Sequence, residues 1–380
     1  MRFYHLSDLH LGKRLNGWSR LEEQRVLLDW VADRAAAERP DAVVIAGDIY
    51  DRPIPSEEAT LLLDRFLRRL NALGVPVLLI SGNHDSGERL AFAADLLDRS
   101  GVYISPVYDG QVKRVRIAGV DFFLLPFLRP SDVRRCFPEK ADEIRTCTDA
   151  LRAALEGARP EPGVPAVLVA HQFVTSAERS GSEEETVGTL DNVDAGVFDG
   201  YAYVALGHIH GRQTLPGSRA VVHYCGAPLK YSVSERHHEK ALTAVTVDGT
   251  GQVQTAFIPL PVPRDVARVT SDFASLMRDG LPFPDLAEDA YLEIILTDED
   301  EFPDAAARLR TRYPYLLSVR YDNARTRAQE AEALPQAGAV LDPLTAFDDL
   351  YAQQNGQPLS DEQRRYLTSL FETLRKEEDA

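Results

Sequence analysis

Residues 77–85 read Val-Leu-Leu-Ile-Ser-Gly-Asn-His-Asp, an apolar run followed at once by a polar cluster. Such a run is typical of a strand buried on both faces of a sheet. The pattern recurs four times: Asp8-Leu-His10 follows 2–6, Gly47-Asp48 follows 42–46, His171 follows 166–170, and Gly207-His208-Ile-His210 follows 203–206. Ligands bind at the carboxyl ends of strands in open α/β sheets. We therefore expect the five polar clusters to meet at one sheet edge.

The remaining patterns complete an α/β layered domain. Apolar runs at 120–125 and 220–224 predict two more strands, and 22–38 and 57–73 carry apolar residues at helical spacing. Strands that alternate with helices favour a layered α/β fold. After the proline-rich passage 258–264, strand and helix patterns alternate through a smaller α+β domain. Its expected elements are strands at 266–270, 291–297 and 316–321 and helices at 273–278 and 303–312.

The chain is expected to have four parts. These are a catalytic domain (1–262), the small α+β domain (263–323), a polar linker (324–342) and a helical segment (343–380). The helical segment has two apolar stripes, Leu344, Phe347, Leu350 and Tyr351, then Tyr366, Leu367, Leu370, Phe371 and Leu374. Ser360 and Gln363 have the spacing of a capping box before the second stripe. These stripes either pack on their own domain or dock on a partner.

Composition narrows the class of protein. The 380 residues are 44% hydrophobic and 27% charged, as in ordinary globular chains, and no apolar run is long enough to cross a bilayer. Residues 1–6 carry no signal-peptide pattern, so we expect a cytoplasmic protein. The three cysteines form no metal-binding or disulfide pattern. The net charge of −17 argues against a protein that coats nucleic acid by charge, but not against a metal-dependent enzyme.

The five clusters supply carboxylate, amide and imidazole donors without a thiolate. This mixture suits manganese, iron or zinc better than calcium. Seven donors are too many for one ion and enough for two that share a carboxylate. The spacing of Asp8 and His10 places both on one side of an extended segment, as does that of His208 and His210. Taken singly, Asp48 is also explained as a helix cap and 83–85 as a turn, but five such clusters at strand ends favour metal binding.

These motifs together resemble the signature of the calcineurin-like metallophosphoesterases, over roughly residues 1–230. The resemblance implies a layered α/β sandwich and two Mn²⁺ ions, with Mg²⁺, Fe or Zn as substitutes. It assigns one metal to Asp8, His10, Asp48 and His210, and the other to Asp48, Asn83, His171 and His208. Asp48 would bridge the two ions. His84 would be the catalytic group that orients the phosphate or protonates the leaving oxygen.

Two stretches, 6–12 and 226–235, are similar to the SbcD family of bacterial nuclease subunits. That resemblance implies a 3′–5′ exonuclease on double-stranded DNA ends and an endonuclease on hairpins and blocked ends, in recombination and repair. The small domain would be a capping domain, and the C-terminal helices would dock on the coiled-coil base of an SbcC-like ATPase. It also implies a homodimer through 61–73 and 90–97, a heterotetramer with the partner, and association with the nucleoid. The chain has no nucleotide-binding loop, so the partner would use the ATP.

Further residues receive supporting roles from their positions. Asp51 replaces a second non-ligand histidine of some relatives, and it would instead hold Arg52 or a metal-bound histidine. Asp85 would orient His84 or cap the following helix. Contacts to DNA phosphates are expected from Lys13, Arg14, Asn16, Arg20, Lys230 and Tyr231.

Two other functions remain open at the level of sequence. The first is a metallophosphoesterase of a small phosphodiester or a phosphoprotein, although such an enzyme needs neither a capping domain nor a helical tail. The second is a DNA-end tethering subunit with a vestigial site, which the complete set of donors argues against.

Overall fold

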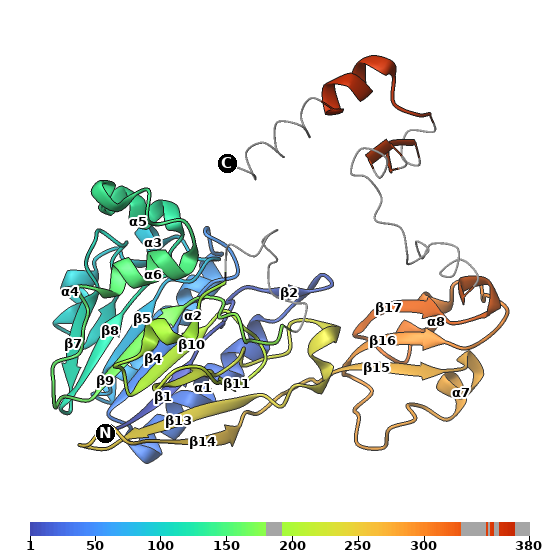
Figure 1. Ribbon diagram of the computed structural model, residues 1–380. Coiled ribbons are helices and arrows are strands. Elements are labelled where there is room, and N and C mark those ends of the chain that lie inside the picture. The colour runs from blue at the N-terminus through green and yellow to red at the C-terminus, as the bar shows by residue number, and fades with distance from the viewer. Residues whose placement is uncertain (180–191, 328–346, 349, 353–356, 369–380) are drawn as a thin grey trace. The chain divides into compact units, whose positions relative to one another are not determined.

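The computed structural model describes residues 1–179, 192–327, 347–348, 350–352 and 357–368. The chain forms two compact units, Met1–Tyr321 and Asp322–Ala380 (Figure 1). The first unit contains two six-stranded sheets and a smaller three-stranded module.

The first large sheet has the order β14-β13-β1-β4-β5-β6. Its parallel part consists of β1 (Arg2–Leu6), β4 (Ala42–Ala46), β5 (Val77–Ile80) and β6 (Val102–Ile104), extended in antiparallel fashion by β13 (Ala241–Val247) and β14 (Val253–Pro259). The second sheet has the order β11-β12-β10-β9-β8-β7. Here β8 (Val120–Leu124), β9 (Ala166–His171), β10 (Tyr203–Gly207) and β12 (Val221–Tyr224) are parallel, with β7 (Lys113–Ile117) and β11 (Gln213–Leu215) antiparallel at the edges.

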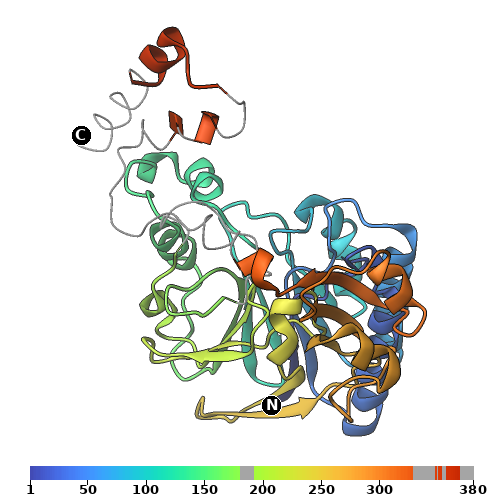
Figure 2. The same ribbon diagram turned by 90° about the vertical axis from the view of Figure 1, so that its right-hand side faces the viewer.

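The two sheets pack face to face and helices cover their outer sides. Phe3, Val44 and Leu78 of the first sheet share one buried core with Phe122 and Val167 of the second. Helices α1 (Leu21–Glu38) and α2 (Glu57–Ala72) pack on the first sheet, and α5 (Pro130–Cys136) and α6 (Cys147–Leu155) pack on the second. Figure 2 shows these two halves side by side. Because the central strands are buried on both faces, their sequences are continuously apolar.

The predicted strands and helices of this unit are confirmed, but the prediction of one sheet edge is wrong. Strands β1, β4 and β5 lie in the first sheet, whereas β9 and β10 lie in the second. Their carboxyl ends meet because the two sheets pack together. The sequence patterns did not predict the antiparallel strands β7, β11, β13 and β14, the parallel strand β6, the short strands β2 (Arg14–Leu15) and β3 (Trp18–Ser19), or the helices α3 (Gly87–Leu90), α4 (Ala94–Asp98), α5 and α6. Strands β7 and β14 are mostly exposed and lack the apolar runs that mark the central strands.

The three-stranded module has its own core. Its elements are β15 (Val266–Ser271), α7 (Phe273–Arg278), β16 (Tyr291–Leu296), α8 (Ala305–Arg310) and β17 (Leu316–Tyr321), in the order that the sequence predicts. The strands form a parallel sheet in the order β15-β16-β17, and the helices are the crossover connections. Residues such as Leu276, Ile294 and Leu309 are completely buried inside it.

A buried polar cluster joins this module to α1. The hydroxyl of Tyr291 donates to Glu23 Oε1 over 2.8 Å, and Arg264 forms an ion pair with the same oxygen at 3.1 Å. The guanidinium of Arg20 lies 4.4 Å from the centre of the Tyr291 ring. Arg20 and Glu23 have no significant solvent exposure, so this contact is built into the fold.

In the second unit, residues 361–368 are helical. The predicted capping box at its start is confirmed, since Ser360 N–H donates to Gln363 Oε1 and Gln363 N–H donates to Ser360 Oγ. Residues 328–342 of the expected linker lie outside the described residues, as do Leu344, Leu370, Phe371 and Leu374 of the two stripes. Within the described part of the chain, no helix has the length and apolar character needed to cross a bilayer.

Candidate metal centre

The five predicted clusters meet at one end of the sandwich. Each lies at the carboxyl end of a central strand or in the loop that follows it: β1, β4, β5, β9 or β10. The loops after β1 and β4 are tied together, because Asp8 N–H donates to Gly47 O and His10 N–H donates to Asp48 O, both over 3.0 Å. The backbone thus fixes the positions of the polar side chains before any ligand binds.

The backbone of these loops is strained. Asp8, His10, Asp48 and His208 have φ angles of 51°, 44°, 49° and 99°, in the left-handed region that side chains other than glycine rarely adopt. Each such residue costs on the order of 1–3 kcal/mol, and residues of this kind concentrate at functional sites.

Glycine is required where the loops cross. A Cβ atom on Gly207 would collide with the carbonyl oxygen of Ala46, and one on Gly47, which has a φ of +85°, would collide with the imidazole of His171. Only glycine therefore allows the close approach of the loops at both positions.

Asp48 is central among the donors. Its Oδ2 lies 3.6 Å from His10 Nε2, 3.3 Å from His171 Nε2 and 3.9 Å from His84 Nε2. Among the described residues, three groups of side chains have the spacing to hold an ion: Asp8, His10 and His210; Asp8, Asp48 and His171; and His10, Asp48 and His84. The structure thus brings Asp8 as well as Asp48 into more than one group.

Asn83 and His208 complete the cluster. The side-chain oxygen of Asn83 lies 3.0 Å from His171 Nε2 and 3.0 Å from His208 Nδ1. The N–H of His208 donates to Asp8 Oδ1 over 3.0 Å. All seven side chains proposed as metal ligands therefore lie together, and most of them are buried.

The charges of the cluster fit a site for divalent cations. Burial raises the pKa of Asp48, but the imidazoles of His171 and His10 outweigh it and hold the pKa of this carboxyl well below its usual range. Burial lowers the pKa of His171, but Asp48 outweighs it and raises the pKa to about 9. Burial raises the pKa of Asp8. Two buried carboxylates need positive charge nearby, which divalent cations supply.

Three histidines of the cluster are held by contacts outside the donor set. His171 Nδ1 donates to the carbonyl of Ala46 over 2.8 Å. His210 Nδ1 lies 3.0 Å from Glu235 Oε1. His84 Nδ1 lies 3.1 Å from the carbonyl oxygen of Asp51. In each case a hydrogen bond to one ring nitrogen leaves Nε2 turned toward Asp48 or His10. Such contacts fix the tautomer and orientation of metal-binding histidines.

Glu235 was not among the predicted site residues. It is buried, and Lys240 neutralises it through a 2.6 Å ion pair. Burial raises the pKa of Glu235, but Lys240 and His210 outweigh it and hold the pKa well below its usual range. Glu235 ends the stretch 226–235 that the sequence analysis singled out, but no spacing rule connected it to His210.

Asp85 holds the backbone of two loops and does not cap the helix that follows, which was one of its two predicted roles. Its carboxylate accepts three backbone N–H groups, from Ile49, Tyr50 and Gly82, at 2.9–3.0 Å. It therefore ties the loops after β4 and β5 together, whereas Ser86 caps the following helix.

Asp51 interacts mainly with Lys13. Asp51 Oδ1 lies 2.7 Å from Lys13 Nζ, 3.9 Å from His10 Nδ1, and its other oxygen lies 3.8 Å from Arg52 Nε. The side chain of Arg52 is exposed. The structure thus brings Asp51 near both expected partners, and its carboxylate is closest to a third, Lys13.

Three of the six predicted DNA contacts lie inside the protein, so their prediction is wrong. Arg20 is packed on Tyr291, Tyr231 is buried with its hydroxyl on the carbonyl of Leu9, and Lys230 Nζ is engaged by Asp265 at 2.6 Å. In the amino-acid sequence, buried basic and aromatic residues that lie close to a site motif cannot be distinguished from residues of an exposed binding patch. Lys13, Arg14 and Asn16 remain at the surface or partly exposed.

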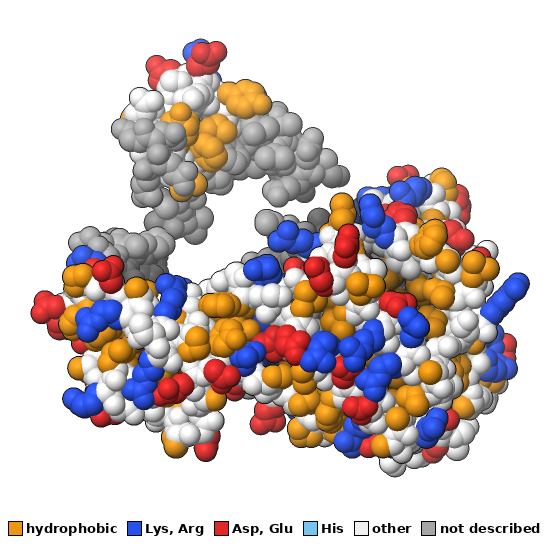
Figure 3. All heavy atoms as spheres, turned by 180° about the vertical axis from the view of Figure 1, so that it is seen from behind, with side chains coloured by type: hydrophobic (Ala, Val, Ile, Leu, Met, Phe, Trp, Pro, Cys, Tyr) orange, Lys and Arg blue, Asp and Glu red, His pale blue; other side chains and the backbone are white. Residues whose placement is uncertain are grey.

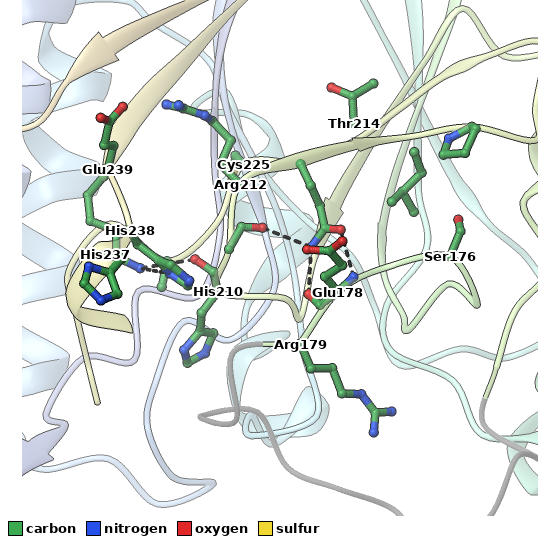
Figure 4. Close-up of a pocket in the computed structure, with 16 residues that line it drawn as sticks. Ser176, Glu178, Arg179, His210, Arg212, Thr214, Cys225, His237, His238 and Glu239 are labelled. Atoms are coloured by element: carbon green, nitrogen blue, oxygen red, sulfur yellow. Dashed lines mark hydrogen bonds between the residues drawn. The ribbon is translucent and has the colours of Figure 1, made fainter. Parts of the chain in front are cut away.

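A cavity of about 640 Å³ borders His210 (Figure 4). Figure 4 shows His237 and His238 on one side of it and Ser176 and Thr214 on the other. Arg179 also lines this cavity, but its guanidinium extends away from Glu178. The metal centre thus has solvent-accessible space beside it.

Comparison with known proteins agrees with this geometry. Residues 1–212 match the family model of the calcineurin-like phosphoesterases. The chain belongs to this family. Residues 262–355 of this phosphoesterase match a second model, the SbcD C-terminal domain, described as the type 5 capsule protein repressor C-terminal domain. The two matches together agree with SbcD.

Among solved structures, the phosphoesterase is similar to a dimetal phosphatase from Danio rerio. The two share 15% sequence identity with a TM-score of 0.41, over 69% of this chain and 99% of the other. Membership of the family, together with the clustered donors, supports a phosphoester hydrolase with two metal ions.

Proposed function

We propose that this phosphoesterase is the nuclease subunit of an SbcCD-type complex, a manganese-dependent enzyme that hydrolyses DNA phosphodiesters in recombination and repair. The observation that carries the proposal is the seven-donor cluster around Asp48, in a chain that also matches the SbcD C-terminal domain. Its expected activities are 3′–5′ exonuclease action on double-stranded ends and endonuclease action on hairpins and blocked ends.

We assign the two metal ions as the family resemblance implies. Asp8, His10, Asp48 and His210 would hold one ion, and Asp48, Asn83, His171 and His208 would hold the other. Manganese fits a site of imidazole, carboxylate and amide donors without thiolate. When bound, such a pair polarises the phosphoryl oxygen and lowers the pKa of a bound water. The protein's own contribution is to hold the donors in place through the strained loops and the contacts of Ala46 and Glu235.

We assign His84 as the catalytic histidine. Its Nδ1 contacts the carbonyl oxygen of Asp51, so this nitrogen carries the proton when the ring is neutral. Its Nε2 lies 3.9 Å from Asp48 Oδ2, at the centre of the donors, and the side chain keeps 18% of its exposure. When the ring is also protonated on Nε2, this imidazolium can reach a phosphate oxygen and donate the Nε2 proton to the leaving sugar oxygen. Lys13, Arg14 and Asn16 are proposed to contact DNA phosphates.

The partner surfaces are proposed from exposed apolar side chains. In the second unit, Phe347, Leu350 and Tyr366 are exposed, and we propose that they dock on the coiled-coil base of an SbcC-like ATPase. In the first unit, Phe92 and Leu96 are 81% and 67% exposed beside an apolar cavity of about 640 Å³ between α2 and β6. We propose this as the homodimer surface, which would give a heterotetramer with the ATPase.

The test is hydrolysis of linear and hairpin duplex DNA with added Mn²⁺, with and without an SbcC-type ATPase and ATP. Wild type is compared with Asp48→Ala and His84→Ala, and bound metal is measured for each. We expect Asp48→Ala to lose metal and activity, and His84→Ala to keep metal but lose cleavage.

Two results would contradict the proposal. Hydrolysis of a small diester such as bis(p-nitrophenyl) phosphate, without cleavage of DNA even with the partner, would indicate an enzyme of small phosphodiesters. DNA binding by a protein that takes up no metal would indicate a tethering subunit.

A further inference from the structure

A second cavity, of about 360 Å³, lies directly beside the metal centre. Asn83 and His208 of the donor cluster form part of its wall, and four arginines line it: Arg129, Arg134, Arg145 and Arg179. We call it the arginine pocket. Its volume is at the lower end of the range for small-ligand sites, about 300–1,000 Å³.

The wall of the arginine pocket is basic. Among the described residues, its lining includes no Asp or Glu, and none of its four arginines forms an ion pair. Some other arginines are paired with carboxylates: Arg114 and Arg116 both contact Asp121, for example. Figure 3 likewise shows basic and acidic side chains intermixed on the rear face. Four arginines in one pocket, with no acidic side chain among the described residues that line it, favour the binding of anions in a chain of net charge −17.

Two phenylalanines connect these arginines to the metal centre. The Phe127 ring lies 6.3 Å from that of His171, and the Phe173 ring lies 6.4 Å from that of His208. The guanidinium of Arg129 lies 5.4 Å from the Phe127 ring, and that of Arg179 lies 3.9 Å from the Phe173 ring. When the flat face of a guanidinium lies on an aromatic ring, the N–H donors at the edge of the guanidinium can still bind phosphate.

The other two arginines are anchored by the backbone. Arg134 donates one N–H to the carbonyl of Ile144 over 2.8 Å, and Arg145 donates its Nε–H to the carbonyl of Asp142 over 3.0 Å. Each has further donors beyond these bonds. These hydrogen bonds partly fix the two side chains before a ligand binds. Less conformational entropy is therefore lost on binding.

We infer that the arginine pocket binds the polynucleotide strand next to the scissile bond and takes the phosphate that neighbours the one at the metals. The inference rests on the proposed nuclease function. The metal centre itself accounts for one phosphate, so an additional anion site at its wall fits a substrate with two closely spaced phosphates. A phosphomonoester or a single phosphorylated side chain has only one. The half-buried rings of Phe127 and Phe173 add apolar surface of the kind that contacts bases in single strands.

The test uses two matched double variants of the full chain. Arg129→Gln/Arg179→Gln removes two guanidinium groups that stack on the phenylalanines. Arg135→Gln/Arg152→Gln makes the same change in charge on exposed arginines of α5 and α6 that do not line the pocket. Binding of a labelled single-stranded oligodeoxynucleotide is measured by fluorescence anisotropy over a series of salt concentrations, with chelator present to prevent cleavage. Hydrolysis of bis(p-nitrophenyl) phosphate and of the oligonucleotide is measured with Mn²⁺.

We expect the pocket variant to bind DNA more weakly and with a smaller dependence on salt. Each neutralised phosphate adds about 0.7 to the slope of log K against log salt for single strands, and the pocket takes one phosphate, so the slope falls by about 0.7. Hydrolysis of the small diester stays at the wild-type rate, while kcat/KM on the oligonucleotide falls with the affinity. The control variant keeps the wild-type slope.

The outcomes separate this inference from the proposed function. If wild type cuts DNA and the pocket variant has the same slope and affinity as the control, the pocket is not the strand site and the nuclease function stands. If the pocket arginines account for salt-dependent DNA binding but no DNA is cut, the strand site stands and the nuclease function does not. If wild type does not bind DNA, both are wrong.

Discussion

Glu235 Oε1 lies 3.0 Å from Nδ1 of His210, inside the protein and away from the donors. The opposite ring nitrogen, Nε2, lies 3.1 Å from His10 Nε2 in the donor cluster. Glu235 thus keeps the proton of His210 on Nδ1 and turns Nε2 toward the proposed metal. Lys240 holds the second oxygen of Glu235 at 2.6 Å, so the carboxylate itself has a fixed position.

We predict that Glu235→Gln lowers the affinity for Mn²⁺ of the proposed site that includes His210 by about 10–100-fold. Loss of a carboxylate that orients a metal-binding histidine has an effect of this size in other metal sites. The measurement is titration of the metal-free protein with Mn²⁺ by calorimetry. Glu239→Gln, at a neighbouring exposed position, is the matched control. Equal affinities for the two variants would show that Glu235 does not support the site.

A second prediction concerns the contact between α1 and the three-stranded module. Tyr291→Phe removes the hydroxyl that donates to buried Glu23 over 2.8 Å. A buried carboxylate that loses a donor costs about 1–3 kcal/mol. We therefore expect the free energy of unfolding to fall by this amount in denaturant titration. Tyr366→Phe is the control, because that ring is 70% exposed. A change no larger than the control's would mean that Arg264 alone satisfies Glu23.

The sequence predicted those parts of the site in which an apolar strand and its polar residues are adjacent in the chain. Strands such as β5 are buried on both faces, so their apolar runs and the polar residues after them stand out. The assignment of β9 and β10 to a second sheet could not be predicted, because an apolar run carries no information about which strand it pairs with. Glu235 was missed for the same reason, since its contact with His210 depends on the path of the chain between them.

The other errors in the sequence-based predictions concern charged residues whose surroundings depend on the fold. Arg20 lies shortly after Lys13 and Arg14, which made all three look like one basic surface loop. Its place inside the protein depends on Tyr291, which belongs to another module. The arginine pocket was also missed, because Arg129 and Arg179 are brought together only by the fold.

A third prediction concerns the crossing of the loops. Gly207→Ala places a Cβ atom against the carbonyl oxygen of Ala46, where both backbones are fixed by strand pairing. We expect a loss of about 3 kcal/mol or more of unfolding free energy, at the upper end for overpacking. Gly249→Ala is the control, since no atom lies near its Cβ position. The comparison is made by chemical denaturation, and similar midpoints for the two variants would contradict the close approach.

The last prediction concerns stability in acid. His223 is buried between the sheets with Nδ1 2.8 Å from Thr214 Oγ1, and burial, assisted by Arg212, lowers its pKa to about 4. In the unfolded chain its pKa is near 6.5, so between about pH 6.5 and 4 the unfolded state binds more protons than the folded state. Unfolding free energy therefore falls as the pH falls through this window and depends no further on His223 below it. A shift of this size corresponds to at most about 3 kcal/mol.

His223→Gln keeps a polar side chain but removes the titration. We expect its stability to depend less on pH than that of wild type between about pH 6.5 and 4, with the two curves parallel above this window. Denaturant titrations of both proteins across this range measure the difference directly, because all other carboxyl and histidine groups are common to the two chains. His5 titrates in both chains; its pKa is lowered mainly by burial and further by His223, so the substitution also relieves part of the shift at His5. Parallel curves throughout would show that His223 is not held neutral by the fold.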